Sequence, residues 1–127
     1  MNDNHKLTPD LIEAVDALAE NLLASEPFRA LERAYLRLQS DATARDLQQR
    51  FRQAEATLRQ RQANRSMTQA DMAAYRALHA EAQANALIAG YEQARQAIQV
   101  YLQEVNRDIS QALGVDFAGL AKRSGCC

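Results

Sequence analysis

Apolar residues recur every three or four positions along most of the chain, which is the spacing of one face of an α-helix. The first such run follows Thr8 and Pro9, an N-cap residue with a proline at the first helical position. A break at residues 25–27 separates it from a second, shorter run. That run ends at Ser40 and Asp41, whose side chains can accept hydrogen bonds from the backbone N–H groups that open a third helix. The chain up to Ser40 therefore predicts two consecutive helices.

The middle of the chain predicts a helical hairpin. A third helix runs from about Ala42 to Asn64 on a thin apolar seam, and residues 64–67 form the tip of the hairpin. Thr68 then caps a fourth helix, with Asp71 at the position where a capping box usually has Glu. Most of the third helix is Gln and Arg, so we expect a long, largely exposed antiparallel arm.

A long last helix is predicted from Asn85, its N-cap, to about Leu113. Its apolar positions alternate steps of three and four residues, which is the repeat of left-handed coiled-coil packing. Gly114 suits the position that ends a helix. Beyond it the periodicity disappears, so we expect one helical domain over residues 1–114 and a flexible tail over residues 115–127.

Helices that carry narrow apolar stripes must pack together to bury them. The predicted fold is therefore all-α: an elongated set of antiparallel helical hairpins, or a bundle of about five helices, with a long C-terminal helix. That helix alone would span roughly 42 Å, against a radius of gyration of about 14 Å for a compact domain of this length. Apolar surface beyond what one chain can bury predicts a homo-oligomer or a hetero-complex. Six seam residues are candidates for the partner interface: Phe51, Leu58, Tyr91, Ile98, Leu102 and Val105.

Composition narrows the class of protein without reaching a function. The 127 residues suit a single domain, and four glycines and two prolines leave little turn chemistry for an all-β fold. No run approaches the roughly 18 apolar residues of a membrane span, and residues 1–6 lack the apolar region of a signal peptide. We therefore expect a soluble, cytoplasmic protein with no membrane contact.

The formal net charge of −1 conceals a segregation of charge along the chain. Residues 1–26 carry six acidic side chains against Lys6, whereas residues 27–65 carry nine arginines against four acidic side chains. The arginines suit a contact with RNA phosphates or an acidic protein, or else a solvated arm whose arginines pair with the acidic first helix or with neighbours one turn away. We favour the solvated arm, because such charge patterns carry little specificity. The candidate basic surface comprises Arg29, Arg33, Arg37, Arg50, Arg52, Arg59 and Arg61.

Catalytic and metal-binding patterns are scarce in the sequence. The histidines are His5, near the N-terminus, and His79, which stands two residues from Glu81 and so points to a different helix face. No glycine-rich phosphate loop, nucleophile elbow or helical His-Glu-x-x-His pattern occurs. The sequence thus argues against an enzyme.

The two cysteines are the adjacent residues Cys126 and Cys127. Neighbouring Cα atoms lie about 3.8 Å apart, so a disulfide between them would be strained. Two thiolates could supply half of a four-cysteine metal site, with a second chain supplying the rest. The alternative is an unstructured tail with incidental thiols, which the residues alone favour because a vicinal pair is a weak metal signal.

Three stretches of the chain carry a family resemblance. The first is residues 18–26, a helix that ends in Ser-Glu, and the second is residues 35–51, with a Leu-Gln-x-Asp turn at residues 38–41. The third is residues 85–109, where Asn85, Ile88, Tyr91 and Ala94 open the last helix. Taken in order, over about residues 8–113, these stretches resemble the YlbF/YmcA family of bacterial regulators.

The resemblance implies an all-helical, non-enzymatic regulator that assembles with related helical proteins and with a third protein. It implies support of ribonuclease Y in mRNA processing, with that ribonuclease as a further partner, and a role in competence, sporulation and biofilm development. Complexes of the family are associated with iron–sulfur clusters, which would make Cys126 and Cys127 ligands of a [4Fe-4S] cluster shared between chains. A helical regulatory adaptor is thus the leading hypothesis, and an RNA-binding helical module that uses the Arg-rich middle segment is the alternative.

Overall fold

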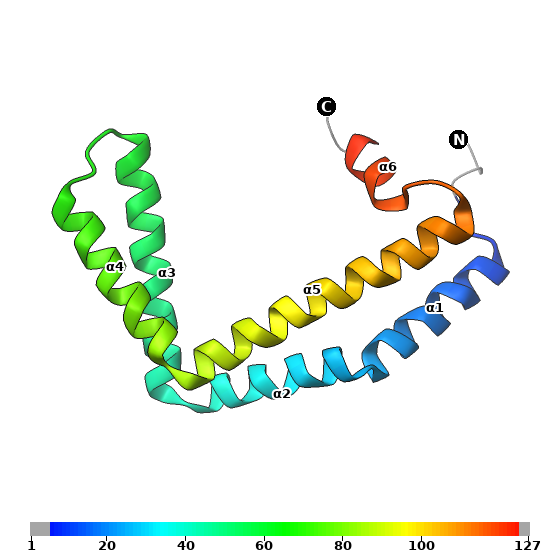
Figure 1. Cartoon of the computed structure of the whole chain (residues 1–127), viewed down its shortest axis with the longest axis horizontal. Coiled ribbons are helices and arrows are strands. Elements are labelled where there is room, and N and C mark those ends of the chain that lie inside the picture. Colours follow the sequence, from blue (N-terminus) through cyan, green and yellow to red (C-terminus); the bar gives the residue numbers. More distant parts are fainter. Residues whose placement is uncertain (1–5, 125–127) are drawn as a thin grey trace.

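The computed structural model describes residues 6–124, and every regular element in that range is an α-helix. The helices are α1 (Pro9–Ala24), α2 (Glu26–Ser40), α3 (Ala42–Ala63), α4 (Gln69–Ala84), α5 (Ala86–Leu113) and α6 (Phe117–Ser124). They form a V in which α3 and α4 pair as an antiparallel hairpin in one arm, while α5 lies antiparallel to α2 in the other (Figure 1). The predicted all-helical, elongated fold is confirmed, and its long helix is α5, of 28 residues. Over residues 6–124, no helix combines the length and the hydrophobicity needed to span a bilayer.

Single residues with extended backbone separate α1 from α2, α2 from α3 and α4 from α5: these are Ser25, Asp41 and Asn85. The Asp41 side chain accepts a hydrogen bond from the Ala44 amide at 2.7 Å. The Asn85 side chain accepts from the amides two and three residues later, at 3.0 and 3.1 Å. These bonds satisfy N–H groups that the start of a helix leaves unpaired. Successive helices therefore change direction with no intervening loop, and the predicted caps at Asp41 and Asn85 are confirmed.

The core lies at the elbow of the V, where the α2–α3 and α4–α5 joints lie side by side (Figure 1). Four of the buried apolar residues stand within six positions of Asp41 or Asn85, and Leu38 is only 1% exposed. Burial at this point holds the two arms together, because apolar contacts are the main favourable term in folding. Among the described residues, the buried apolar side chains are Leu38, Ala44, Leu47, Ala82 and Ile98.

The hairpin tip turns through residues 64–68, and Arg65 there has a left-handed backbone conformation with a φ of 56°. Thr68 Oγ1 accepts a hydrogen bond from the Asp71 amide at 3.1 Å, and an Asp71 carboxylate oxygen accepts one from the Thr68 amide at 2.9 Å. The two bonds form the predicted capping box, with Asp in place of the usual Glu. The start of α4 is therefore fixed by local chemistry.

The chain after α5 differs from the sequence prediction. Gly114 is left-handed, with a φ of 72°, and ends α5 as predicted. Residues 117–124 then form α6, where the sequence predicts a flexible tail, so the fold has a helix beyond the predicted five. The first amides of α6 find local acceptors: Ser110 Oγ accepts from the Phe117 amide, and the Asp116 carboxylate accepts from the Gly119 amide, both at 3.1 Å. This capping starts a helix that apolar periodicity does not reveal, and α6 folds back against the end of α5 (Figure 1).

We expect Leu38→Ala to lower the free energy of unfolding by about 3 kcal/mol, because it leaves a cavity at the elbow. Leu36→Ala changes a side chain of the same helix that is 58% exposed, and should cost about 0.5 kcal/mol or less. Urea unfolding followed by circular dichroism measures both changes. Equal losses for the two variants would show that the core lies elsewhere.

Candidate interaction surfaces

Helix α1 presents an apolar stripe that its own chain leaves largely exposed. No Cα atom of α1 lies within 8 Å of any described helix other than α2. The stripe side chains are between 38% and 66% exposed. An exposed apolar stripe at helical spacing is the kind of surface that a partner helix covers. The α1 stripe comprises Leu11, Ile12, Val15, Leu18 and Leu23.

A notch of about 880 Å³ opens at the elbow, between the α3–α4 hairpin and the start of α5. Phe51 of α3, His79 of α4 and Tyr91 of α5 line it. The Phe51 ring centroid lies 5.5 Å from that of Tyr75 and 5.7 Å from that of His79. His79 Nε2 also lies 3.4 Å from the side-chain nitrogen of Gln83. Because these contacts hold the rings within the hairpin, the notch has a preformed aromatic wall.

The predicted interface residues are distributed over both arms. Phe51 and Tyr91 meet at the notch, and both are half-buried. Leu58 is half-buried too, but it lies further along α3 in the hairpin arm. Leu102, which is 41% exposed, and the half-buried Val105 lie in the second half of α5, in the other arm. The structure therefore brings Phe51 and Tyr91 together, places Leu58 apart from them in the hairpin arm, and keeps Leu102 and Val105 as neighbours on α5.

Packing determines whether two further apolar surfaces, Ile98 and the α1 stripe, are buried or exposed, which the spacing of apolar residues alone does not show. Ile98 is 8% exposed and belongs to the core of this chain, so little of its surface is available to a partner. The α1 stripe is absent from the predicted interface, although its helical spacing is plain in the sequence. One sequence signal could have identified α1 as an exposed helix. It carries four acidic side chains and no basic one beside its apolar stripe, and this composition is typical of a helix that faces solvent.

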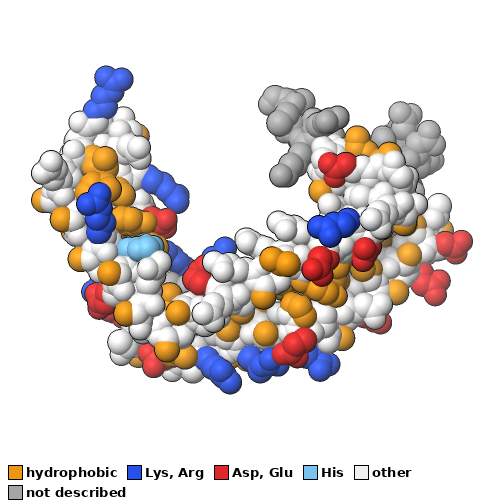
Figure 2. All heavy atoms as spheres, viewed as in Figure 1, with side chains coloured by type: hydrophobic (Ala, Val, Ile, Leu, Met, Phe, Trp, Pro, Cys, Tyr) orange, Lys and Arg blue, Asp and Glu red, His pale blue; other side chains and the backbone are white. Residues whose placement is uncertain are grey.

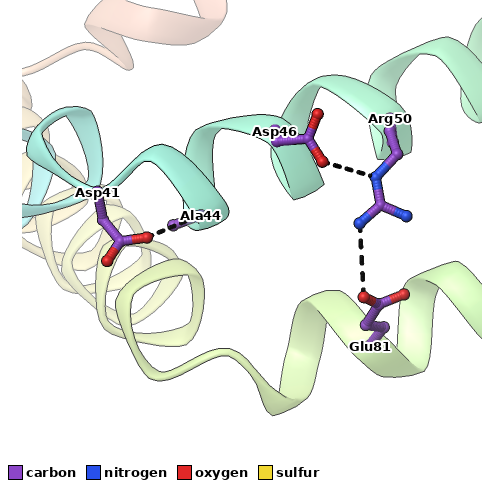
Figure 3. Close-up of polar contacts among 5 residues, drawn as sticks. All are labelled: Asp41, Ala44, Asp46, Arg50 and Glu81. Atoms are coloured by element: carbon purple, nitrogen blue, oxygen red, sulfur yellow. Dashed lines mark hydrogen bonds and ion pairs between the residues drawn. The ribbon is translucent and has the colours of Figure 1, made fainter.

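Arg50 is held in ion pairs that link the two helices of the hairpin (Figure 3). Its guanidinium group lies 3.0 Å from Asp46, one turn earlier on α3, and 3.5 Å from Glu81 on α4. Arg59 similarly lies 3.7 Å from Glu55. Such solvent-exposed pairs contribute little to stability. They do, however, occupy two of the arginines that would otherwise be available to an external anion.

The candidate basic surface divides between the arms of the V. Arg29, Arg33 and Arg37 lie along α2 at four-residue spacing, whereas the other four arginines lie on α3. Figure 2 shows Lys and Arg side chains along the α2 edge and on the hairpin arm, with acidic side chains spread over both arms and at the α1 end. Arg33 pairs with Glu26 at 2.5 Å, while Arg29 and Arg37 have no ion pair within residues 6–124. Helix α2 therefore carries a basic edge of its own.

A narrow groove of about 390 Å³ runs between α2 and α5 beside this basic edge. Arg33 and Arg37 line it, and no acidic side chain does so among the described residues. A Cβ atom at Gly90 would meet nothing within 4 Å, so the groove has room there. The other residues of this α2–α5 groove are mostly small: Ala30, Ala34, Ala86, Leu87, Gln93 and Ala94.

Arg61, near the end of α3, and Asp71, in the first turn of α4, form an ion pair across the hairpin tip. The hydrogen bond from Arg61 is the main reason that the pKa of Asp71 is lowered to about 2, and the Thr68 amide contributes as well. The same contact raises the pKa of Arg61. Asp71 thus serves both the capping box and the closure of the hairpin.

Metal-binding clusters of three or more His, Cys, Asp or Glu side chains are absent from the described part of the chain. Cys126 and Cys127, the predicted ligands of the [4Fe-4S] cluster, lie outside the described residues, as does His5. The iron–sulfur expectation therefore stays a prediction.

Comparison with known proteins identifies one matching family. A sequence model described as "Control of competence regulator ComK, YlbF/YmcA" matches residues 11–114. The fold is similar to one chain in the X-ray crystal structure of Bacillus subtilis RicA in complex with RicF, with a TM-score of 0.73. The two are 23% identical, and the match covers 85% of this chain and 96% of that one. A search of curated proteins finds no match.

We expect Asp71→Asn to lose stability relative to the wild type at pH 5, and this difference to narrow steadily below about pH 4 and become small near pH 2. The pKa of Asp71 is lowered to about 2 in the folded chain. Its ionised carboxylate therefore stabilises the fold above the ordinary pKa of about 3.9, and that contribution disappears as the pH falls through the folded value.

Thermal unfolding followed by circular dichroism between pH 5 and pH 2 measures this difference. Asp108→Asn is the matched control, because Asp108 is exposed and forms no ion pair in the described structure. Its difference from the wild type should show no comparable narrowing. A constant difference for Asp71→Asn over the whole range would contradict the stabilising role of the ionised carboxylate.

Proposed function

The chain belongs to the YlbF/YmcA family, and we propose that it is a helical regulatory adaptor that acts by binding other proteins rather than by catalysis. The observation that carries this proposal is the family match over residues 11–114, which extends from the first turn of α1 to the end of α5. Support comes from the similar structure, in which RicA is in complex with RicF.

The exposed α1 stripe supports an assembly function on physical grounds. Apolar surface that moves from water into an interface is stabilised by about 25 cal/mol per Å². A helix of 16 residues is only marginally stable in water when nothing packs against it. A partner that covers the α1 stripe would therefore gain affinity and stabilise α1 at the same time.

The elbow notch supplies a second contact surface. Phe51 and Tyr91 are aromatic side chains in a partly enclosed site, and such residues dominate the binding energy of many interfaces. Acidic and basic side chains, including Arg52 and Glu55, also line the notch. Mixed charge around an aromatic centre favours a partner of matching pattern and so contributes specificity.

In finer detail, the partners are related helical regulators and a ribonuclease, and the assembly supports ribonuclease Y-dependent mRNA processing in the cytoplasm. Competence, sporulation and biofilm development are the processes that such an assembly regulates. This part of the proposal is supported by family membership and by the description of the family as a regulator of competence.

RNA binding is the second candidate function, and the basic edge of α2 favours it. Arg29, Arg33 and Arg37 present guanidinium groups at one-turn spacing, and this geometry suits phosphates. Against it stands the division of the basic surface between two arms, together with the ion pairs that occupy Arg50, Arg59 and other members. Phosphate contacts weaken steeply as salt rises, whereas apolar contacts do not.

The proposal includes an iron–sulfur cluster shared between chains. A [4Fe-4S] cluster takes four thiolate ligands, and Cys126 and Cys127 would supply half of them. The remaining ligands would come from another chain, so a bound cluster would link the subunits through iron–thiolate bonds.

Affinity capture of the full chain from native lysate, quantified by mass spectrometry, tests the adaptor function. We expect recovery of related helical proteins and a ribonuclease, and at least about a tenfold loss when Leu11→Glu is combined with Val15→Glu, because the new charges would be buried at the interface. Met67→Glu is the matched control at the hairpin tip, where Met67 is 40% exposed, and should leave recovery unchanged.

Ribonuclease treatment and a salt wash of about 0.5 M form the second arm of this experiment. Recovery that survives both treatments agrees with direct protein contact. Loss of all partners under both treatments would show that RNA holds them, which favours the second candidate. Full recovery by the doubly substituted α1 variant would refute the role of the α1 stripe.

Anaerobic purification of the assembled complex tests the cluster. We expect iron and acid-labile sulfide in the wild-type complex, and their loss from a variant that combines Cys126→Ser with Cys127→Ser, because serine is a poor ligand for iron–sulfur clusters. Metal analysis and visible absorption measure both. An iron-free wild-type complex would remove the cluster from the proposal.

A further inference from the structure

The elbow notch is lined by aromatic rings, carboxamides and arginines that come from α3, α4 and α5 (Figure 1). Its volume of about 880 Å³ lies in the range of ligand pockets, roughly 300–1,000 Å³. Proteins recognise unpaired bases by stacking them on aromatic side chains and by hydrogen bonds to their edges. The notch thus has the size and the types of side chain that this recognition requires.

The aromatic wall is supported by rings outside the notch. Phe51 and His79 line the notch, whereas Tyr75 contacts both rings without lining it. Across the notch, on α5, the Tyr91 ring centroid lies 6.2 Å from that of Tyr35. Rings that are already held in place lose little conformational freedom when a base stacks on them. The wall is therefore prepared for stacking.

Four glutamine side chains line the same notch. Gln83 lies 3.4 Å from His79 Nε2, so its amide is engaged. The side-chain amides of the other three form no hydrogen bond within residues 6–124. A carboxamide places a donor and an acceptor side by side, which matches the edge of a base such as adenine. The three glutamines available to a base are Gln48, Gln93 and Gln96.

Ion pairs engage every Arg and Glu side chain of the notch except Arg52. Glu92 lies 3.1 Å from Arg95, and Glu55 lies 3.7 Å from Arg59. Arg52 forms no ion pair within the described residues, and its side chain is exposed. A guanidinium group that no carboxylate holds suits a phosphate. The acidic side chains of the notch therefore leave one cation for an anionic ligand.

The row of arginines to which Arg52 belongs extends beyond the notch. Arg45 and Arg59 stand seven residues before and after it, so the three lie on one face of α3, and all are exposed. At 1.5 Å per residue, successive arginines are roughly 10 Å apart along the helix axis. A strand with one base in the notch would bring further phosphates to this face. The row therefore favours a nucleotide within a strand over a free nucleotide.

We propose that the elbow notch binds an unpaired nucleotide of single-stranded RNA, with its base stacked on the wall of Phe51 and His79 and a phosphate on Arg52. The proposal rests on the proposed function in one respect, namely that RNA, the second candidate there, is the ligand. Stacking supplies much of the affinity for single strands, so no continuous basic surface is needed. An adaptor with this site would hold a transcript beside its protein partners.

Fluorescence anisotropy with a labelled oligoadenylate of about ten nucleotides, in low salt, tests the stacking wall on the purified full chain. We expect binding by the wild type and a loss of at least about tenfold in Phe51→Leu, because leucine keeps an apolar side chain but removes the ring. Phe28→Leu is the matched control on α2, where Phe28 is half-buried and does not line the notch. It should bind as the wild type does.

A pair of charge reversals tests the phosphate contact in the same assay. We expect at least about a tenfold loss in Arg52→Glu and little change in Arg76→Glu. Both arginines are exposed and lack an ion pair in the described structure, but only Arg52 lines the notch. The two variants have the same net charge, so a difference between them reports the site and not the overall field.

Nuclear magnetic resonance of the unaltered chain tests the site without any substitution in it. The sequence has two histidines, and His79 is the one in the notch wall. A base stacked on this wall should shift the ring proton signals of His79, while the signals of His5 serve as the internal reference. The variant His5→Gln assigns the two sets. Unshifted His79 signals at saturating oligoadenylate would refute the proposed site.

Further outcomes separate this proposal from other ligands and from the adaptor function. No binding in low salt, equal losses in Arg52→Glu and Arg76→Glu, or equal affinity for an RNA duplex of the same length would overturn it, because a duplex offers no unpaired base. Displacement of the strand by an equal concentration of adenosine monophosphate would also overturn it, since the ligand would then be a free nucleotide.

Protein capture distinguishes the remaining cases. A chain that binds no RNA, but whose captured proteins are lost in Phe51→Leu, has a protein side chain in the notch; it retains the adaptor function and loses this site. A chain that binds RNA in the notch but captures no protein retains the site and loses the adaptor function.

Discussion

The arrangement of the whole chain depends on two one-residue joints at the elbow. Asp41 and Asn85 each end one helix and cap the next, which short side chains with an acceptor oxygen can do. Because no loop intervenes, the change of direction is concentrated where Leu38, Leu47 and Ala82 are buried. The divergence of the arms follows from this point, and with it the notch and the separation of the arginines on α2 from those on α3.

Away from the elbow, the chain has too few neighbours to cover its own apolar faces. Each arm is only about two helices thick, so one side of every helix faces solvent (Figure 1). The α1 stripe is the clearest example of an uncovered apolar face, because within the described structure α1 contacts only α2. A protein built in this way has a small core in its described part and several apolar surfaces that other chains can cover.

Local chemistry made much of the fold predictable. The caps at Thr8, Thr68 and Asn85 and the stop at Gly114 were all predictable, because each depends on a side chain or a φ angle within a few residues. Helix α6 was missed, since its start depends on Ser110 and Asp116 and not on periodic apolar residues.

The interaction surfaces were less predictable than the fold. Periodicity selected Phe51 and Tyr91, which share the notch, but it also selected the buried Ile98 and omitted the α1 stripe. An apolar face looks the same in a sequence whether the chain or a partner covers it. The packing of helices against one another decides between the two, and it depends on contacts between residues far apart in the chain.

The hairpin of α3 and α4 has a further consequence for how such proteins can diverge. Every residue from 61 to 70 is exposed, and the tip touches neither the groove nor the α1 stripe. Matched insertions of whole helical turns into both helices would lengthen this arm while preserving its pairing register and leaving the elbow unaltered. The length of the α3–α4 arm can therefore change during evolution while Asp41 and Asn85, which set its direction, stay the same.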